Sequence, residues 1–136
     1  MEQMEKLRRW LQTFPLWGTA KLYIDSLPVG LGQTGLYPMG VEVLERRDDL
    51  LGNVRTRLRQ RFVLYRNVCP GEDQSLWLLQ LQQWVAQQWA LGLAPRFGDE
   101  SAAESLRAEK GALKEVTAAG TAVYTVNITL EYVKIY

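Results

Sequence analysis

Four arginines recur at every second position near the middle of the sequence. They are Arg55, Arg57, Arg59 and Arg61, within the segment VRTRLRQR. In an extended strand alternate side chains share a face, so these guanidinium groups form one straight stripe, whereas a helix would scatter them around its circumference. A guanidinium is a planar fork that binds carboxylates and phosphates in bidentate geometry. The arginine stripe therefore predicts a strand face that pairs with acidic groups.

Two interpretations of the arginine stripe are open. In the first, acids of neighbouring strands, such as Glu42 or Glu131, neutralise a solvated sheet face, each cross-strand pair contributing about 0.2–1 kcal/mol. In the second, the stripe faces a partner, either an acidic protein surface or a nucleic-acid backbone. All four positions are Arg and none is Lys, which favours pairing that depends on geometry.

The residues needed for most catalytic and metal chemistry are missing or isolated. The sequence has no histidine, which excludes Ser-His-Asp and Cys-His nucleophiles and the commonest metal ligand. Cys69 is the single cysteine, and we interpret it as a small buried side chain. The acid pairs Asp48/Asp49 and Asp99/Glu100 are neighbours in turn-like segments, where acids are usually solvated. We therefore expect no enzymatic activity, no cofactor and no metal site.

A glycine-rich segment raises the question of a phosphate-binding loop. Residues 30–35, GLGQTG, have the GxGxxG spacing of a dinucleotide site. Such a site requires a helix to follow within a βαβ unit, but Pro38 and Gly40 come next. We interpret the whole segment 27–40 as a long loop, and loops of this length are often functional. A flexible loop or an interface arm is the favoured interpretation.

The arginine stripe needs a strand to pair with, and the preceding residues supply one. Residues 41–47 are predicted as a strand in which simple alternation puts Glu42 and Glu45 on opposite faces. The segment 48–53, DDLLGN, has turn chemistry, and 54–66 is predicted as the second strand of a β-hairpin. The apolar positions of that strand share the face opposite the arginines: Val54, Leu58, Phe62 and Leu64.

The remaining elements predict an α+β fold. Apolar residues at helical spacing predict helices over 4–14 and 75–91. Residues 22–24 and 105–118 are predicted as strands, and strict alternation over 124–132 predicts a last strand. Because βαβ repetition is absent, we expect a mostly antiparallel sheet with a long hairpin and with helices packed on one face.

Length and composition indicate one domain that spans the chain. The 136 residues are 47% hydrophobic and 23% charged, and domains typically have about 100–150 residues. No apolar run approaches the roughly 20 residues of a membrane-spanning helix, and no signal peptide is evident, so we expect a cytoplasmic protein without membrane contact. The net charge of +1 gives no general reason to expect nucleic-acid binding.

The sequence has five tryptophans, more than a chain of this length usually carries. Most of them lie on predicted helix faces and are expected in the core. Trp17 instead follows the end of the first helix, beside Gly18. Because tryptophan is favoured in interface hot spots, Trp17 is the candidate for an exposed anchor.

The layout of these elements resembles the small tail terminator and minor capsid (head–tail joining) proteins of long-tailed bacteriophages and prophages. The likeness covers most of the chain. The residues that carry it are GNVRTRLRQRFVLYRN at 52–67, SLWLLQLQQWV at 75–85 and AVYTVNITLEYVKIY at 122–136.

The resemblance implies an α+β protomer that assembles into a ring, commonly of six copies, which caps the tail tube and joins it to the head. The implied partners are further copies, the tail tube, head-completion proteins and DNA in a channel, and the implied locations are the host cytoplasm and the assembled virion. On this sequence the arginine stripe would face a neighbour, the tube or the DNA channel. The 27–40 loop would be an assembly arm, with Gly30, Gly32, Leu36 and Tyr37 as contact residues. The family has no catalytic residues to transfer.

The alternative hypothesis is a small nucleic-acid-binding or adaptor module that uses the Arg55–Arg61 strand face. The arginine-rich part of this face has no interleaved aromatic residues, which counts against stacking of single-stranded bases. Tyr65 continues the same face and supports the alternative. A third hypothesis, an enzyme that uses only carboxylates or arginines, would require a deep polar pocket.

Overall fold

The fold is a five-stranded sheet with two helices. The computed structural model describes residues 2–17, 21–27, 33–68, 75–99, 104–116 and 120–136. Within these residues the elements are, in chain order, α1 (Glu2–Leu11), β1 (Leu22–Ile24), β2 (Thr34–Asp48), β3 (Val54–Val68), α2 (Ser75–Ala90), β4 (Ser105–Val116) and β5 (Ala122–Ile135).

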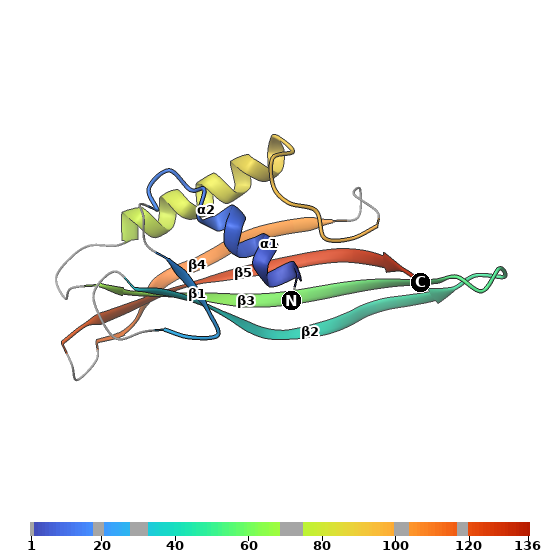
Figure 1. Cartoon of the computed structure of the whole chain (residues 1–136), viewed down its shortest axis with the longest axis horizontal. Coiled ribbons are helices and arrows are strands. Elements are labelled where there is room, and N and C mark those ends of the chain that lie inside the picture. The colour runs from blue at the N-terminus through green and yellow to red at the C-terminus, as the bar shows by residue number, and fades with distance from the viewer. Residues whose placement is uncertain (1, 18–20, 28–32, 69–74, 100–103, 117–119) are drawn as a thin grey trace.

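The sheet is mixed but mostly antiparallel. Its strand order is β1-β2-β3-β5-β4. Strand β1 runs parallel to β2, and the pairs β2–β3, β3–β5 and β4–β5 are antiparallel. Both helices lie on the same side of the sheet (Figure 1). The predicted α+β class and the mostly antiparallel sheet are confirmed.

The centre of the sheet is the pairing of β3 with β5. It runs from Arg55–Ile135 to Val68–Ala122 without a register shift. Because side chains alternate between faces, the even-numbered residues of both strands point towards the helices. These residues are largely apolar and form the floor of the core: Phe62, Leu64, Val68, Val126, Ile128 and Leu130.

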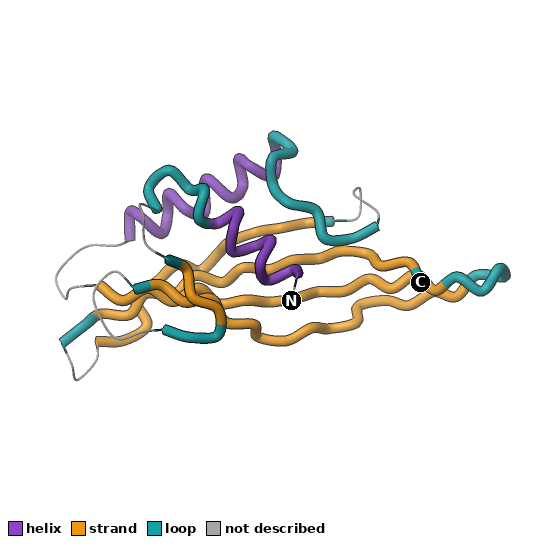
Figure 2. The backbone as a smooth tube through the Cα atoms, in the orientation of Figure 1, coloured by secondary structure: helices purple, strands orange, loops and turns teal. Residues whose placement is uncertain are grey.

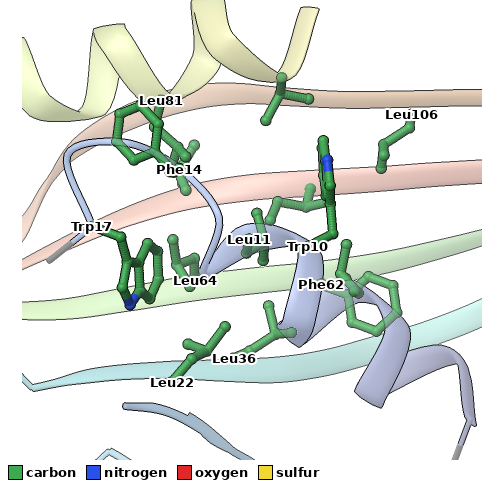
Figure 3. Packing of buried hydrophobic residues seen from close by; sticks show 14 of the residues in the cluster. Trp10, Leu11, Phe14, Trp17, Leu22, Leu36, Phe62, Leu64, Leu81 and Leu106 are labelled. Carbon is green, nitrogen blue, oxygen red and sulfur yellow. The ribbon is translucent and has the colours of Figure 1, made fainter. Parts of the chain in front are cut away.

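The helices close the core over this floor. Helix α1 buries Leu7 and Leu11, and α2 buries Leu78, Leu81 and Val85. Figure 3 shows Leu11 and Leu81 directed into the same cluster as the strand residues. In the described part of the chain, neither helix has the length and apolar character needed to span a membrane.

An aromatic cluster joins the two helices. The rings of Trp10 and Trp84 stack with centroids 4.9 Å apart, and Phe14 lies 5.3 Å from Trp84 and 5.6 Å from Trp77. Trp17 belongs to this cluster: it is only 3% exposed and its ring centroid lies 5.8 Å from that of Trp77. The prediction of an exposed Trp17 anchor is therefore wrong. The chain turns back after α1, where the backbone N–H of Trp17 donates to the Phe14 carbonyl oxygen, and this turn brings the indole into the core.

The second half of the predicted 27–40 loop, residues 34–40, is strand. Strand β2 begins at Thr34, and Thr34, Gly35 and Leu36 pair with β1 on one side and with β3 on the other. Leu36 is fully buried, so its side chain is not accessible for the contact predicted for it. The glycine at 35 serves close packing instead of flexibility, because a Cβ there would lie 2.1 Å from the Ser26 carbonyl oxygen.

Proline and glycine are tolerated in β2 because, after its pairing with β1 ends at Leu36, β2 is the outer strand of the described sheet. Pro38 lies opposite Phe62, and the register shifts between Pro38 and Val41 at a bulge where Gly40 has φ 111°. A proline lacks the N–H that a central strand would need, so it is tolerated at such edges and bulges. Among the other sequence-based predictions, those for Gly30, Gly32 and Cys69 concern residues outside the described part of the chain.

The buried face of α2 provides a test of this packing. Leu81 is fully buried and Leu79 is half exposed on the same helix. We expect Leu81→Ala to lower the free energy of unfolding by about 2–5 kcal/mol, because it removes transfer energy and leaves a cavity. Leu79→Ala should change it by less than about 0.5 kcal/mol. Denaturant unfolding of both variants measures this difference, and equal losses would contradict the packing.

Candidate interaction surface

The sheet face opposite the helices, here called the open face, collects most of the charged strand residues. The four arginines of the stripe alternate with helix-side residues on β3 and so all point to the open face. In the antiparallel register, residues that lie opposite one another on neighbouring strands share a face. The register therefore assigns Glu42, Glu45 and Arg47 of β2, Glu131 of β5 and Ser105 and Arg107 of β4 to the open face.

Glu131 is the acid around which these groups gather. It lies directly opposite Arg59 on β3 and Ser105 on β4. Its Oε1 is 3.3 Å from Arg59 Nη2 and 3.8 Å from Arg57 Nη2. Its Oε2 accepts from the Ser105 hydroxyl at 3.3 Å and from Arg107 Nη1 at 3.4 Å. One carboxylate thus holds three guanidinium groups from two strands that do not themselves pair.

The surroundings of Glu131 keep it ionised. Its residue is only 9% exposed, and burial raises the pKa of its carboxyl. The attraction of Arg59, the hydrogen bond from Ser105 and the attraction of Arg57 and Arg107 outweigh that effect and hold the pKa below the usual 4.5. The cluster still has more cations than anions, and the buried Nε atoms of Arg57 and Arg59 have no hydrogen-bond partner within the described residues.

The outer strand β2 contributes further acidic residues to the open face, and a bulge places one of them there. Glu42 lies opposite Arg59 and Glu45 opposite Arg57, with a register shift between Val43 and Glu45. The predicted placement of Glu42 and Glu45 on opposite faces is therefore wrong, because the extra residue returns Glu45 to the open face. Glu42 Oε1 lies 2.8 Å from Arg61 Nη1. Both acids proposed as neutralising partners, Glu42 and Glu131, do contact the arginine stripe.

Beside the stripe lies a polar groove of about 480 Å³ on the open face. Its cations are Arg61, Arg107 and Lys110, and Asn127 and Thr129 add uncharged donors from β5. Lys110 has φ 59° where the register of β4 shifts, which lets it line the groove. The groove is a candidate for an anionic group, although Glu109 also lines it.

The structure separates the sequence-predicted interface residues into distinct groups. The side chains of Arg57, Arg59 and Arg61 are 43%, 27% and 53% exposed, and they share the open face. Tyr37 is half-buried on β2, where its ring centroid lies 5.1 Å from that of Tyr65. Trp17 and Leu36 lie in the core instead.

Sequence reasoning missed Ser105, Arg107 and Lys110. The segment 105–116 shows weak alternation because β4 contains two register shifts, so its faces were not assigned. The only available signal was the alternation from Ser105 to Glu109, which precedes the first shift. Knowing that β4 lies beside β5, and in which register, requires the fold.

A metal-binding group of side chains is not found in the described part of the chain. No group of three or more His, Cys, Asp or Glu side chains there is placed to hold a metal ion. No protein-family model matches the sequence, and no curated protein matches it.

Replacing Glu131 tests the charge cluster. Because its pKa is lowered in the folded state, ionised Glu131 stabilises the protein above pH 4.5, and this contribution is lost as the pH falls through the folded-state pKa. Glu131→Gln should lower the free energy of unfolding at neutral pH by about 1–3 kcal/mol. It should also reduce the loss of stability on acidification below pH 4.5.

Glu109→Gln is the matched control, because Glu109 lies on the same face in a more exposed pair with Arg107 at 3.4 Å. Its effect should stay below about 1 kcal/mol. Thermal unfolding of the three proteins across pH gives both quantities. Identical acid sensitivity in the wild type and Glu131→Gln would contradict the assigned role of Glu131.

Proposed function

We propose that this protein is a structural assembly component of a phage or prophage tail. Its copies form a terminator-like ring that caps the tail tube and joins it to the head. In the proposed protomer the helices pack on one sheet face, the long hairpin of β2 and β3 projects as an arm, and the open face makes contacts. The protein is not an enzyme.

The observation that carries the proposal is the arginine-rich open face. Arg57, Arg59 and Arg107 share the single carboxylate of Glu131, so the face keeps an excess of guanidinium donors on a sheet side that the helices do not cover (Figure 1). Guanidinium groups held in fixed geometry suit recognition of carboxylates on a neighbouring protein surface. The resemblance to tail terminators assigns a charged sheet face the same role.

The outer strand β2 and its exposed apolar side chains also support assembly. Strand β2 is paired on its outer side only at Thr34–Leu36, and the described residues provide no further neighbour for it. Val41 and Val43 are 55% and 64% exposed there. Long exposed strands with apolar side chains favour association with other chains.

The alternative function is binding of a nucleic acid through the open face. The groove formed by Arg61, Arg107, Lys110, Asn127 and Thr129 favours it, since these are donors that suit phosphate oxygens. A DNA complex whose affinity falls steeply with salt, formed by a monomeric protein, would support this alternative over assembly.

The mass of the purified protein tests self-assembly directly. We expect light scattering to detect a closed oligomer, by the resemblance about six chains, whose population rises with protein concentration. Arg57→Ala/Arg59→Ala should weaken this assembly at least about tenfold, because it removes two guanidinium donors, whereas Glu131 keeps its contacts with Ser105 and Arg107.

The matched control is Arg8→Ala/Arg9→Ala, which removes two arginines from α1 on the other side of the sheet. It should leave the oligomer mass unchanged. Unfolding of the Arg57→Ala/Arg59→Ala protein under conditions where the control is folded would show that the stripe is structural. A wild type that remains monomeric at every concentration and salt would contradict self-assembly of the isolated protein.

A further inference from the structure

Two leucines at the tip of the β2–β3 hairpin are exposed to an unusual degree. Leu50 is 104% and Leu51 is 88% exposed. They lie in the turn 49–53, called the arm tip here, which Figure 2 shows at one end of the sheet and away from both helices. Exposure of two apolar side chains to water is unfavourable in free energy. The arm tip is therefore suited to burial against another surface.

The arm tip is ordered by its own hydrogen bonds. Asp49 Oδ1 accepts from the backbone N–H groups of Leu51 at 2.8 Å and Asn53 at 2.9 Å, and Asp49 Oδ2 accepts from the Asn53 side chain at 3.0 Å. Gly52 takes φ 86°, which glycine adopts without strain. The leucines are therefore presented on a formed turn, and little conformational entropy is lost when they bind.

A hollow of about 310 Å³ lies on the open face at the other end of β2 and β3. We call it the tyrosine hollow. Its walls are mainly apolar and come from Tyr37, Pro38, Tyr65 and Val123, with Met39 between it and the polar groove. The volume is at the lower end of the range for binding pockets, about 300–1,000 Å³, so it suits a short apolar tip.

One chain cannot place its own arm tip in its own tyrosine hollow. Tyr65 and Val54 are at opposite ends of the extended strand β3, about 35 Å apart at the rise of a strand. An apolar projection and an apolar hollow on the same chain, at separate places, generate a head-to-tail contact between copies. Such contacts close into rings when the rotation between copies permits.

The charges beside the two surfaces define one favourable orientation. Asp49 adjoins the leucines, and the hydrogen bonds from the Asn53 backbone and side chain are the main cause that holds its pKa below the usual 3.8, so it is an anion. The rim of the hollow carries Lys114, whose Nζ lies 4.6 Å from the Tyr65 ring centroid, and Glu115. An approach that brings Asp49 to Lys114 and away from Glu115 pairs opposite charges.

We propose that Leu50 and Leu51 of one copy insert into the tyrosine hollow of a second copy. This inference rests on the proposed self-assembly and specifies one interface of it. The contact is heterologous, so each copy donates one arm tip and receives one.

Complementary variants test the contact. Leu50→Ser/Leu51→Ser removes the apolar side chains of the arm tip and leaves the tyrosine hollow intact. Met39→Asp places a charge at the tyrosine hollow and leaves the arm tip intact. Each variant alone should show association weakened by about 100-fold or more, since burial of the two leucines is lost. An equimolar mixture should form a one-to-one dimer, because it contains one intact arm tip and one intact hollow. Light scattering gives the masses, and thermal unfolding verifies that both variants are folded.

The matched control is Leu76→Ser/Leu79→Ser, which removes two exposed leucines from α2 and should leave association unchanged. If the wild type assembles and the arm-tip variant assembles equally well, the inference is overturned while self-assembly stands. A mixture that stays monomeric, with both variants folded, also overturns it. A wild type that is monomeric throughout overturns the inference together with the proposed self-assembly.

Discussion

The uninterrupted pairing of β3 with β5 is the constraint on which the rest of the structure depends. Because the register holds from Arg55–Ile135 to Val68–Ala122, every even-numbered residue of both strands faces the helices and every odd-numbered one faces away. The apolar even set builds a core with α1 and α2. The same register gathers the arginine stripe and Glu131 on the open face, so the core and the charge cluster follow from one alignment.

The outer strands depart from this regularity, and their irregularities shape the surface. Bulges in β2 return Glu45 to the face of the stripe, and shifts in β4 direct Lys110 towards the polar groove. A bulge can form where a strand has one free side, since it disrupts only one ladder of hydrogen bonds. The central strands β3 and β5 determine which of their charged residues share the open face. The register shifts of the outer strands β2 and β4 determine which residues of those strands lie beside them.

Assembly gives the exposed features a common explanation. The helices cover one sheet face, the open face carries an excess of arginine, and the arm tip and the tyrosine hollow lie at opposite ends of one hairpin. In a proposed ring, each copy would contribute distinct surfaces to its two neighbours, as a heterologous interface requires. The resemblance to tail terminators and the exposed leucines, which are independent observations, favour the same kind of function.

Local pattern by itself determined the α+β class, the strand 54–66 with its arginine face, both helices and the last strand, because periods of 2 and 3.6 are properties of consecutive residues. It also indicated Glu42 and Glu131 as partners of the stripe. It failed at Leu36 and Trp17, whose burial depends on the return of the chain to the sheet, and at Gly35, which lies in a strand packed closely against Ser26. Only the tertiary structure decided that β4 lies beside β5. The convergence of Ser105, Arg107 and Arg59 on Glu131 joins residues far apart in sequence, and no local pattern specifies such a register.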